Sequence, residues 1–406
     1  MTLALAMDFD RPAADALSAL RGRDLLCFSH DWTGDPLSKT HLMKLLARDN
    51  RVLWVNSIGY RAPAATAADL GRAWRKLKAA ASPLTEPLPN LHVLSPLAVP
   101  AWGSPAVRAF NKTFLRWQVR RAMRKLRFRR PINWVFNPAA AVLAGSLGED
   151  RVIYYCVDEY TAFAGVPAES LIELERGLLK RADLVVVSAE RLLKSKGPYN
   201  PRTVLVRHWV DFDHFRTALD PATAVPAEVR NLPKPVIGYF GLMSPDWVDV
   251  SVLEATAKRF SGGSLVLVGK VAMDLGPLAK LPNVHVLGRK PYESLPAYCK
   301  GFDAAVIPFP VSEVTLSANP LKAREYLAAG LPVVSTPIPE VEVLGLCGIG
   351  RTPAEFVERL EEALADPGPS RGRSERMRTE GWAARLDEVR GHYARLVAGE
   401  EGPWTA

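Results

Sequence analysis

Short, almost entirely apolar runs alternate with longer amphipathic segments along most of the chain. Runs such as RVLWV at 51–55 and LVVVS at 184–188 have the length of strands, and segments such as 39–48 and 171–181 have helical spacing. A strand that is apolar on both faces needs helices on both sides of its sheet, as in parallel α/β folds. The alternation therefore predicts doubly wound α/β structure, in which ligands bind outside the carboxyl ends of the strands.

The alternation is interrupted once, in the proline-rich stretch ALDPATAVPAEVRNLPKP. A chain of 406 residues is long enough for about two domains. We therefore predict an N-terminal domain over 1–217, a linker over 218–235 and a C-terminal domain over 236–375, followed by a helix over 376–398.

The formal net charge of +9 is concentrated in RWQVRRAMRKLRFRR at 116–130, which holds eight cations and no acid. Apolar residues recur at helical spacing through this region, beginning at Val107, Phe110 and Phe114. A basic amphipathic helix is typical of binding to an anionic membrane surface, and the basic cluster 72–78 could join it. The alternative is a core-packed helix with a solvated outer face. We expect no nucleic-acid partner, because no RRM, KH or helix-turn-helix signature accompanies the charge.

The sequence has no clear pattern for disulfides, for a signal peptide or for a membrane span. The four cysteines are scattered without CxxC spacing, which predicts reduced thiols in a reducing compartment. Residues 1–10 lack a basic start followed by an apolar core, and no apolar run reaches 18 residues. We expect a cytoplasmic protein that is peripheral on the inner face of the membrane.

The most informative segment is SANPLKAREYLAAGLPVVST at 317–336. Asn319-Pro320 is typical of a helix start, where free backbone N–H groups can bind phosphate. Lys322 lies in the first turn, and Glu325, one turn further on, could accept hydrogen bonds from a pair of ribose hydroxyls. The alternative is a solvated Lys/Glu face.

This segment resembles the nucleotide-sugar-binding element of GT-B glycosyltransferases, specifically the large retaining family four ("group 1"). The form NPLKxxEYLAAG is similar to the teichuronic-acid and capsular polysaccharide branch. Glu325 matches the second Glu of the family's E-x7-E motif, whereas Ser317 stands in place of the first. VIGYFGL at 236–242 resembles the family's first donor-domain strand and glycine turn, and residues 284–309 resemble its G-R-x-x-Y-x-x-L-P-x-Y segment and the strand after it.

The resemblance implies a GT-B architecture of two facing Rossmann-like domains with a C-terminal crossover helix near Trp382. It implies that the C-terminal domain binds a nucleotide sugar and that the N-terminal domain binds a saccharide or lipid-linked acceptor. The donor-binding residues that we predict are Gly241, Gly269, Arg289, Lys290, Ser317, Asn319, Leu321, Lys322 and Glu325.

In the N-terminal domain, His30 follows the first predicted strand, and Asp158 and Glu159 follow a later one (YCVDEY). These three are the catalytic candidates, because their types can orient an acceptor hydroxyl or take its proton. A hydrogen-bonded loop histidine and a helix N-cap are the structural alternatives for His30 and Asp158. His208 and Trp209 replace the usual Asn-Gly of the family, and they either wall the interdomain cleft or pack as core.

The implied reaction is sugar transfer with retention of configuration, by a hexosyltransferase-like enzyme that uses no metal. The chain has no P-loop, no HExxH and no Cys/His cluster, and its DFD at 211–213 matches the interdomain segment instead of a metal site. Helix N-termini and cations would neutralise the leaving diphosphate. Three alternatives remain. They are a catalytically silent scaffold, suggested by Ser317, a nucleotide-sugar epimerase of the same fold, and a peripheral membrane adaptor that uses only the basic helix and leaves the donor motif unexplained.

Overall fold

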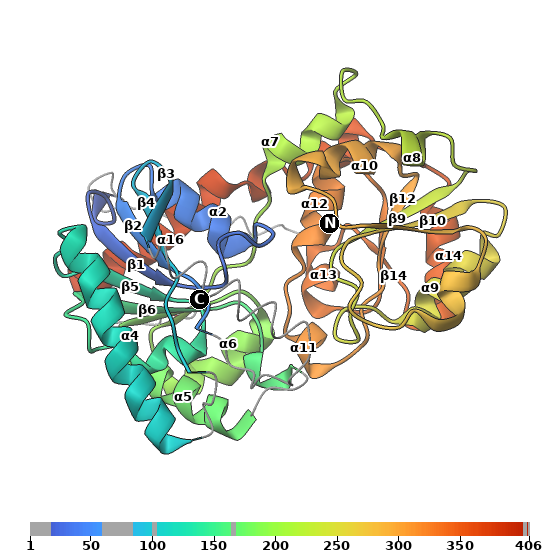
Figure 1. The fold of residues 1–406 in the computed structure, drawn as a ribbon. Helices are drawn as coiled ribbons and strands as arrows, with labels where there is room; N and C mark the ends of the chain where they lie inside the picture. Colours follow the sequence, from blue (N-terminus) through green and yellow to red (C-terminus); the bar gives the residue numbers. More distant parts are fainter. Residues whose placement is uncertain (1–17, 59–83, 100–103, 164–167, 401–403, 405–406) are drawn as a thin grey trace, which may run out of the picture.

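The structure of the protein is a computed structural model that describes residues 18–58, 84–99, 104–163, 168–400 and 404. The N-terminal segment 1–10 and the basic cluster 72–78 lie outside the described residues. The described residues form two sheets, one in each half of the chain (Figure 1).

The first sheet has the order β3-β4-β2-β1-β5-β6-β7-β8, and all neighbours are parallel except the β3–β4 pair. From β4 onward this is a Rossmann-like order, which reverses direction between β1 and β5. The strands are β1 (Asp24–Phe28), β2 (Arg51–Val55), β3 (Leu84–Leu88), β4 (Leu91–Leu94), β5 (Ile132–Val135), β6 (Arg151–Cys156), β7 (Leu184–Val187) and β8 (Thr203–Leu205).

The second sheet is parallel throughout, with the order β11-β10-β9-β12-β13-β14. It reverses direction between β9 and β12, which again places a crevice at the carboxyl ends of these two strands. The strands are β9 (Val236–Phe240), β10 (Ser264–Val268), β11 (Val284–Gly288), β12 (Ala304–Ile307), β13 (Val333–Ser335) and β14 (Gly348–Ile349).

Each sheet separates two apolar cores. In β1, Leu26 and Phe28 face one core, whereas Leu25 and Cys27 face the other. Strand residues alternate between the two faces of a sheet, so a strand that is apolar at every position needs cover on both faces. This is the physical reason why the continuous apolar runs of the sequence became central parallel strands.

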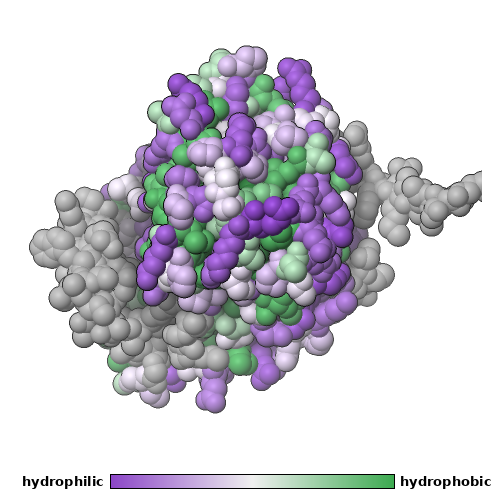
Figure 2. All heavy atoms as spheres, turned by 90° about the vertical axis from the view of Figure 1, so that its right-hand side faces the viewer, coloured by the Kyte–Doolittle hydropathy of each residue, from purple (hydrophilic) through white to green (hydrophobic). Residues whose placement is uncertain are grey.

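Helices supply that cover. The longer ones are α2 (Ser38–Leu46), α4 (Pro105–Lys125), α5 (Ala168–Arg181), α9 (Val250–Arg259), α12 (Leu321–Ala328), α14 (Pro353–Ala363) and α16 (Trp382–Ala398). The shorter ones are α6 (Glu190–Lys196), α7 (Phe212–Phe215), α8 (Ala227–Arg230), α10 (Leu295–Gly301), α11 (Glu313–Leu316), α13 (Pro339–Leu344) and α15 (Arg371–Glu375). On the outward face of the C-terminal half, polar residues are interspersed with small apolar groups (Figure 2).

Helix α16 returns to the first sheet. Its residues Leu386, Val389 and Tyr393 are buried in the same core as strands β1 and β2. Arg390 also forms an ion pair with Asp49, with Nη2 to Oδ2 at 2.8 Å. The last helix therefore joins the two halves, as predicted for a crossover helix, although it begins at Trp382 and not at 376.

The strands expected from apolar runs are present, whereas β3 and β14 were not predicted. Strand β3 (LTEPL) is mostly exposed and contains Pro87, which is compatible with an edge strand but gives no apolar pattern. Strand β14 has only two residues. None of the helices in the described parts of the chain combines the length and apolarity needed to cross a membrane.

Candidate active site

The carboxyl ends of β9 and β10 meet at two glycines. Gly241 has φ +141° and Gly269 has φ +144°, a region that L side chains rarely adopt. A Cβ atom on Gly269 would lie 1.8 Å from the Gly241 carbonyl oxygen, so no side chain fits there. A Cβ atom on Gly241 would lie 2.7 Å from the Lys322 Nζ. The two glycines therefore leave bare backbone directly beside the Lys322 ammonium.

Lys322 is the second residue of α12. Its Nζ lies 3.3 Å from the Tyr239 hydroxyl, and 4.7 Å from the centres of both the Tyr239 and the Phe309 rings. Burial lowers the pKa of Lys322 to about 8, against the opposing effect of the Glu325 carboxylate. Within the described residues, Lys322 has no ion-pair partner. A cation held between aromatic rings without a counter-ion is suited to an incoming anion.

Glu325 lies one turn further along α12. Burial raises the pKa of its carboxyl to about 7; the Lys322 charge lowers it and the Asp211 charge raises it further. Among the residues that the structure describes, nothing donates a hydrogen bond to this carboxylate. A half-buried carboxylate without donors is costly, and ligand hydroxyls would supply the donors that it lacks.

The facing edge of the first sheet carries the predicted catalytic residues. The His30 ring lies between Ser29 Oγ, 3.1 Å from Nδ1, and Thr40 Oγ1, 3.3 Å from Nε2. Burial lowers the pKa of His30 to about 3, with the Lys39 charge contributing, so the ring is neutral and a weak base near pH 7.

Asp158 follows β6 at the same edge. Burial raises the pKa of its carboxyl to about 6; the Lys39 ammonium lowers it and the Glu159 charge raises it further. In the described part of the chain, its side chain makes no hydrogen bond. A half-buried carboxylate with a pKa near neutrality is a better general base than the neutral His30 ring.

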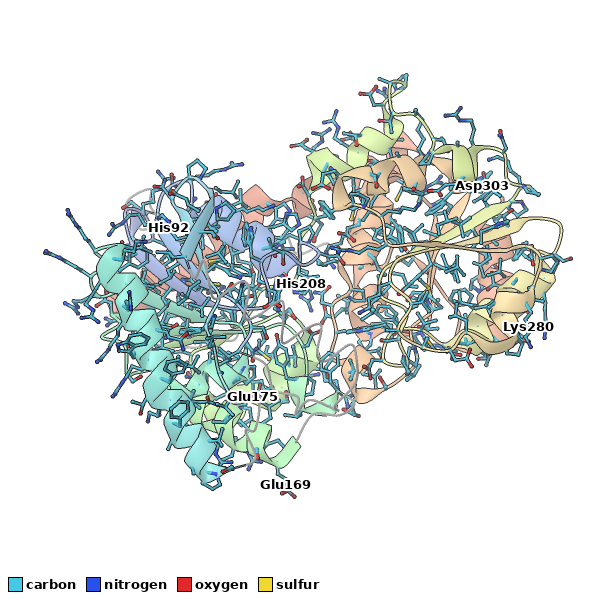
Figure 3. The ribbon with its side chains drawn as sticks, viewed as in Figure 1. His92, Glu169, Glu175, His208, Lys280 and Asp303 are labelled. Carbon is cyan, nitrogen blue, oxygen red and sulfur yellow. The ribbon has the colours of Figure 1, made fainter. Side chains whose placement is uncertain are left out.

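The two edges face each other across polar contacts between the domains. His208 lies between them (Figure 3), and its Nδ1 is 2.7 Å from the Asn319 carbonyl oxygen. The buried Glu340 carboxylate accepts a hydrogen bond from the Glu190 N–H at 2.7 Å and another from Arg207 Nε at 2.8 Å. These contacts bring the carboxyl ends of the two sheets together.

The C-terminal sheet and its helices match a known family. Residues 234–366 match the family model described as "Glycosyl transferases group 1". These residues form a group 1 glycosyltransferase domain. The matched residues include the glycine pair, Lys322 and Glu325.

The sequence is also similar to that of a glycosyltransferase. The chain is 24% identical over 257 residues to a Bacillus subtilis protein provisionally named teichuronic acid biosynthesis glycosyltransferase TuaH. The aligned region covers 58% of this chain and 64% of that relative. The chain therefore matches somewhat less than two thirds of the relative's length.

Solved structures identify the fold of the whole chain. Sucrose-phosphate synthase from Thermosynechococcus elongatus matches 93% of this chain and 100% of its own, with a TM-score of 0.69 at 16% identity. Anabaena Alr3699/HepE, solved with UDP and glucose, matches 93% of this chain and 96% of its own, with a TM-score of 0.58 at 13% identity. The protein has the GT-B fold, which confirms the predicted fold class.

Some predicted donor residues are engaged elsewhere in the glycosyltransferase domain. Asn319 uses its side chain to donate to the Ser188 carbonyl at 2.8 Å and to accept from Arg324 at 2.9 Å. It therefore ties the two domains together. Ser317 is buried at the end of α11, and Leu321 begins α12, where its backbone N–H lies at the helix N-terminus.

The two cations after β11 already have acidic partners. Arg289 Nη2 lies 2.6 Å from Asp35 Oδ1, in an exposed ion pair that links the glycosyltransferase domain to the N-terminal domain. Lys290 Nζ lies 2.7 Å from Glu228 Oε1 in helix α8. Their charges are therefore partly balanced before any ligand binds, unlike the charge of Lys322.

Glu159 is also engaged. Its carboxylate lies 2.8 Å from Lys196 Nζ, which is equally close to the buried Glu175. This ion cluster holds the loop after β6 in place. The structure therefore separates the two adjacent acids into a paired Glu159 and an unpaired Asp158.

Sequence reasoning missed Lys39, in the first turn of α2. The residue is only 8% exposed, and within the described residues its ammonium has no hydrogen bond or ion-pair partner. Burial lowers the pKa of Lys39, whereas the charge of Asp158 raises it. The only sequence signal was its position in DPLSKTH, which follows the loop after the first strand and leads into a helix.

The family resemblance also left His208 and Trp209 undecided. The Trp209 ring is fully buried and packs on Trp382, with centroids 4.8 Å apart, so it belongs to the core. His208 is buried between the domains, and its Nε2 has no partner in the described residues. The described residues contain no group of three or more His, Cys, Asp or Glu side chains placed to hold a metal ion.

Proposed function

We propose that the protein is a glycosyltransferase that moves a sugar from a nucleotide sugar to a saccharide or lipid-linked acceptor in cell-surface polysaccharide synthesis. One observation carries the proposal. Lys322 without an ion-pair partner and Glu325 without a hydrogen-bond donor lie one turn apart on α12, beside the bare backbone of Gly241 and Gly269. The family of residues 234–366 and the name of the Bacillus subtilis relative support it.

In this proposal the donor lies along the start of α12. Lys322 and the helix N-terminus bind the diphosphate, since an ammonium and free backbone N–H groups both stabilise anions. Glu325 accepts hydrogen bonds from the ribose hydroxyls. The glycines let the backbone approach the phosphates closely. The charge of the leaving diphosphate is then balanced by these groups, so we expect no metal requirement.

The acceptor lies against Lys39, His30 and Asp158. The bond between the anomeric carbon and the diphosphate oxygen breaks, and the acceptor oxygen bonds to the same carbon. With retention, the acceptor proton passes to the leaving diphosphate, and Lys39 and Asp158 position the acceptor. With inversion, Asp158 takes that proton, because it is the more basic candidate at neutral pH.

The test is release of nucleoside diphosphate from nucleotide sugars, with and without polyprenyl-phosphate-linked sugars or oligosaccharides as acceptors. Acceptor-dependent release that survives EDTA supports the proposal. Consumption of the donor without any acceptor, to give the epimer of its sugar, supports the epimerase alternative. Nucleotide binding without any turnover supports the scaffold alternative.

We also propose that the enzyme works at the cytoplasmic face of an anionic membrane, held there by residues 116–130. Helix α4 lies along the edge of the N-terminal domain that faces away from the C-terminal domain (Figure 1). Phe110 and Trp117 are 54% and 49% exposed on it. Exposed aromatic rings beside clustered cations favour the interface of an anionic bilayer. Co-sedimentation with anionic vesicles, and its absence with zwitterionic vesicles, is the expected result.

A further inference from the structure

A hollow of about 580 Å³ lies against α4, lined by residues of this helix together with Phe128 and Leu147. Arginines and apolar residues make up all of its lining except for one threonine. The lining residues are Thr113, Arg116, Trp117, Arg120, Met123, Arg124, Phe128 and Leu147. The hollow therefore combines positive charge with an apolar floor.

The three arginines stand four residues apart, so their guanidinium groups lie along one face of the helix. Within the described residues no carboxylate pairs with Arg116, Arg120 or Arg124. Arg120 donates to the Ser146 carbonyl at 2.7 Å, and Arg124 donates through Nε to the Arg120 carbonyl at 3.4 Å. Each guanidinium has five N–H donors, so most of them are available to an anion. Like charges at this spacing repel one another, and an anion between them would relieve the repulsion.

The apolar residues of the hollow belong largely to the core. Met123, Phe128 and Leu147 are buried and form part of the core beneath α4. Trp117 stands at the rim, stacked on Phe114 with ring centroids 6.0 Å apart. A ligand that fills the hollow would therefore place an anion on the arginines and apolar groups against the rim.

We propose that this hollow binds the phosphate headgroup of one anionic phospholipid, with its glycerol and upper acyl chains against Trp117. The inference rests on the membrane-bound function proposed above and makes it specific: one site of defined geometry in place of diffuse attraction. Arginine binds phosphate through paired N–H donors, and the exposed rings of the same helix match a bilayer interface. A soluble phosphate ester shares the anionic chemistry but has nothing to place against the aromatic rim.

The experiment compares two variants that each lose two charges from α4. Arg116→Gln/Arg124→Gln removes cations that line the hollow, and Lys112→Gln/Lys125→Gln removes cations of the same helix that do not line it. Binding of the full chain to phosphatidylglycerol vesicles is measured by sedimentation. Since bonds to charged groups are strong, we expect the first variant to bind at least about tenfold more weakly than the second.

Equal losses in the two variants would overturn the headgroup site and leave only diffuse attraction. The wild-type protein could instead bind glycerol 3-phosphate as strongly as it binds vesicles, and the first variant could lose that binding. This result would overturn the lipid as the occupant of the hollow. Thermal melting and nucleotide binding are followed in parallel. Because both variants leave the donor site untouched, failure of the headgroup site stays distinguishable from failure of the glycosyltransferase proposal.

Discussion

Replacing Lys322 with methionine should make the ligand-free protein more stable and the donor site inactive. The side chain is held between two aromatic rings without a counter-ion, and its pKa falls from 10.5 to about 8. A difference of this size corresponds to at most about 3 kcal/mol of unfavourable charging in the folded state, because the side chain keeps some contact with solvent. Methionine has a similar shape and carries no charge, so it removes this cost.

The pH dependence of this stability difference follows from the lowered pKa of Lys322. Below pH 8 the lysine is charged in both the folded and the unfolded state, and the full cost is present. Between pH 8 and 10.5 the folded protein releases its proton first, so wild-type stability rises relative to Lys322→Met. The stability advantage of the variant should therefore be largest near pH 7 and should shrink towards pH 10. Glu325 faces Lys322 and acts in the opposite direction, since loss of the ammonium raises the pKa of its carboxyl still further.

Urea unfolding at pH 7 and pH 9.5 measures the stability difference, and calorimetry with nucleoside diphosphates measures binding. Loss of a hydrogen bond to a charged group costs about 1.5–3 kcal/mol, so we expect affinity to fall about 10- to 100-fold. Lys322→Arg keeps the charge and serves as the control for shape. A methionine variant with unchanged stability at both pH values and unchanged nucleotide affinity would refute the assignment of Lys322.

Three further predictions use the same site. Glu325→Gln should weaken the binding of nucleoside diphosphates about 10- to 100-fold but leave the binding of inorganic diphosphate unaffected, because only the ribose contact is lost. An equal loss of affinity for both ligands would contradict the ribose role. Asp158→Asn should be more stable than wild type above pH 6, where the half-buried wild-type carboxyl is charged, and should lose that gain as the pH falls towards 3.8. Its turnover should fall less than about 100-fold if the diphosphate takes the proton, since a lost general base costs about 10²- to 10⁴-fold. Gly269→Ala should abolish donor binding through a clash with Gly241, whereas Gly148→Ala, which also has positive φ but open space, should leave binding intact.

The sequence was most informative where a local pattern determines local structure. Apolar runs such as 184–188 could be assigned to buried strands because a strand covered on both faces needs apolar residues at every position. The segment around Lys322 and Glu325 could be found because helix start, cation and acid lie within one short stretch of chain that resembles the nucleotide-sugar-binding element of group 1 glycosyltransferases. These features depend on neighbours in sequence, so a single chain reveals them.

Side-chain partners from distant parts of the chain were beyond that reasoning. Asp35 and Arg289 are 254 residues apart in sequence, and their ion pair depends on how the two domains face each other. Lys39 stood at the start of a predicted helix without any sign of burial, and only the packing of α2 buries it. Asp158 and Glu159 were equivalent as sequence neighbours, and the position of Lys196 separates their roles.

The central claim is that the start of α12 binds a nucleotide sugar, and the most direct test is calorimetric titration of the wild-type protein with UDP, GDP, ADP and their sugar conjugates in the presence of EDTA. The account predicts binding of one nucleotide family without metal, with loss of affinity in both Lys322→Met and Glu325→Gln. Absence of binding for every nucleotide, or binding that neither substitution alters, would contradict it.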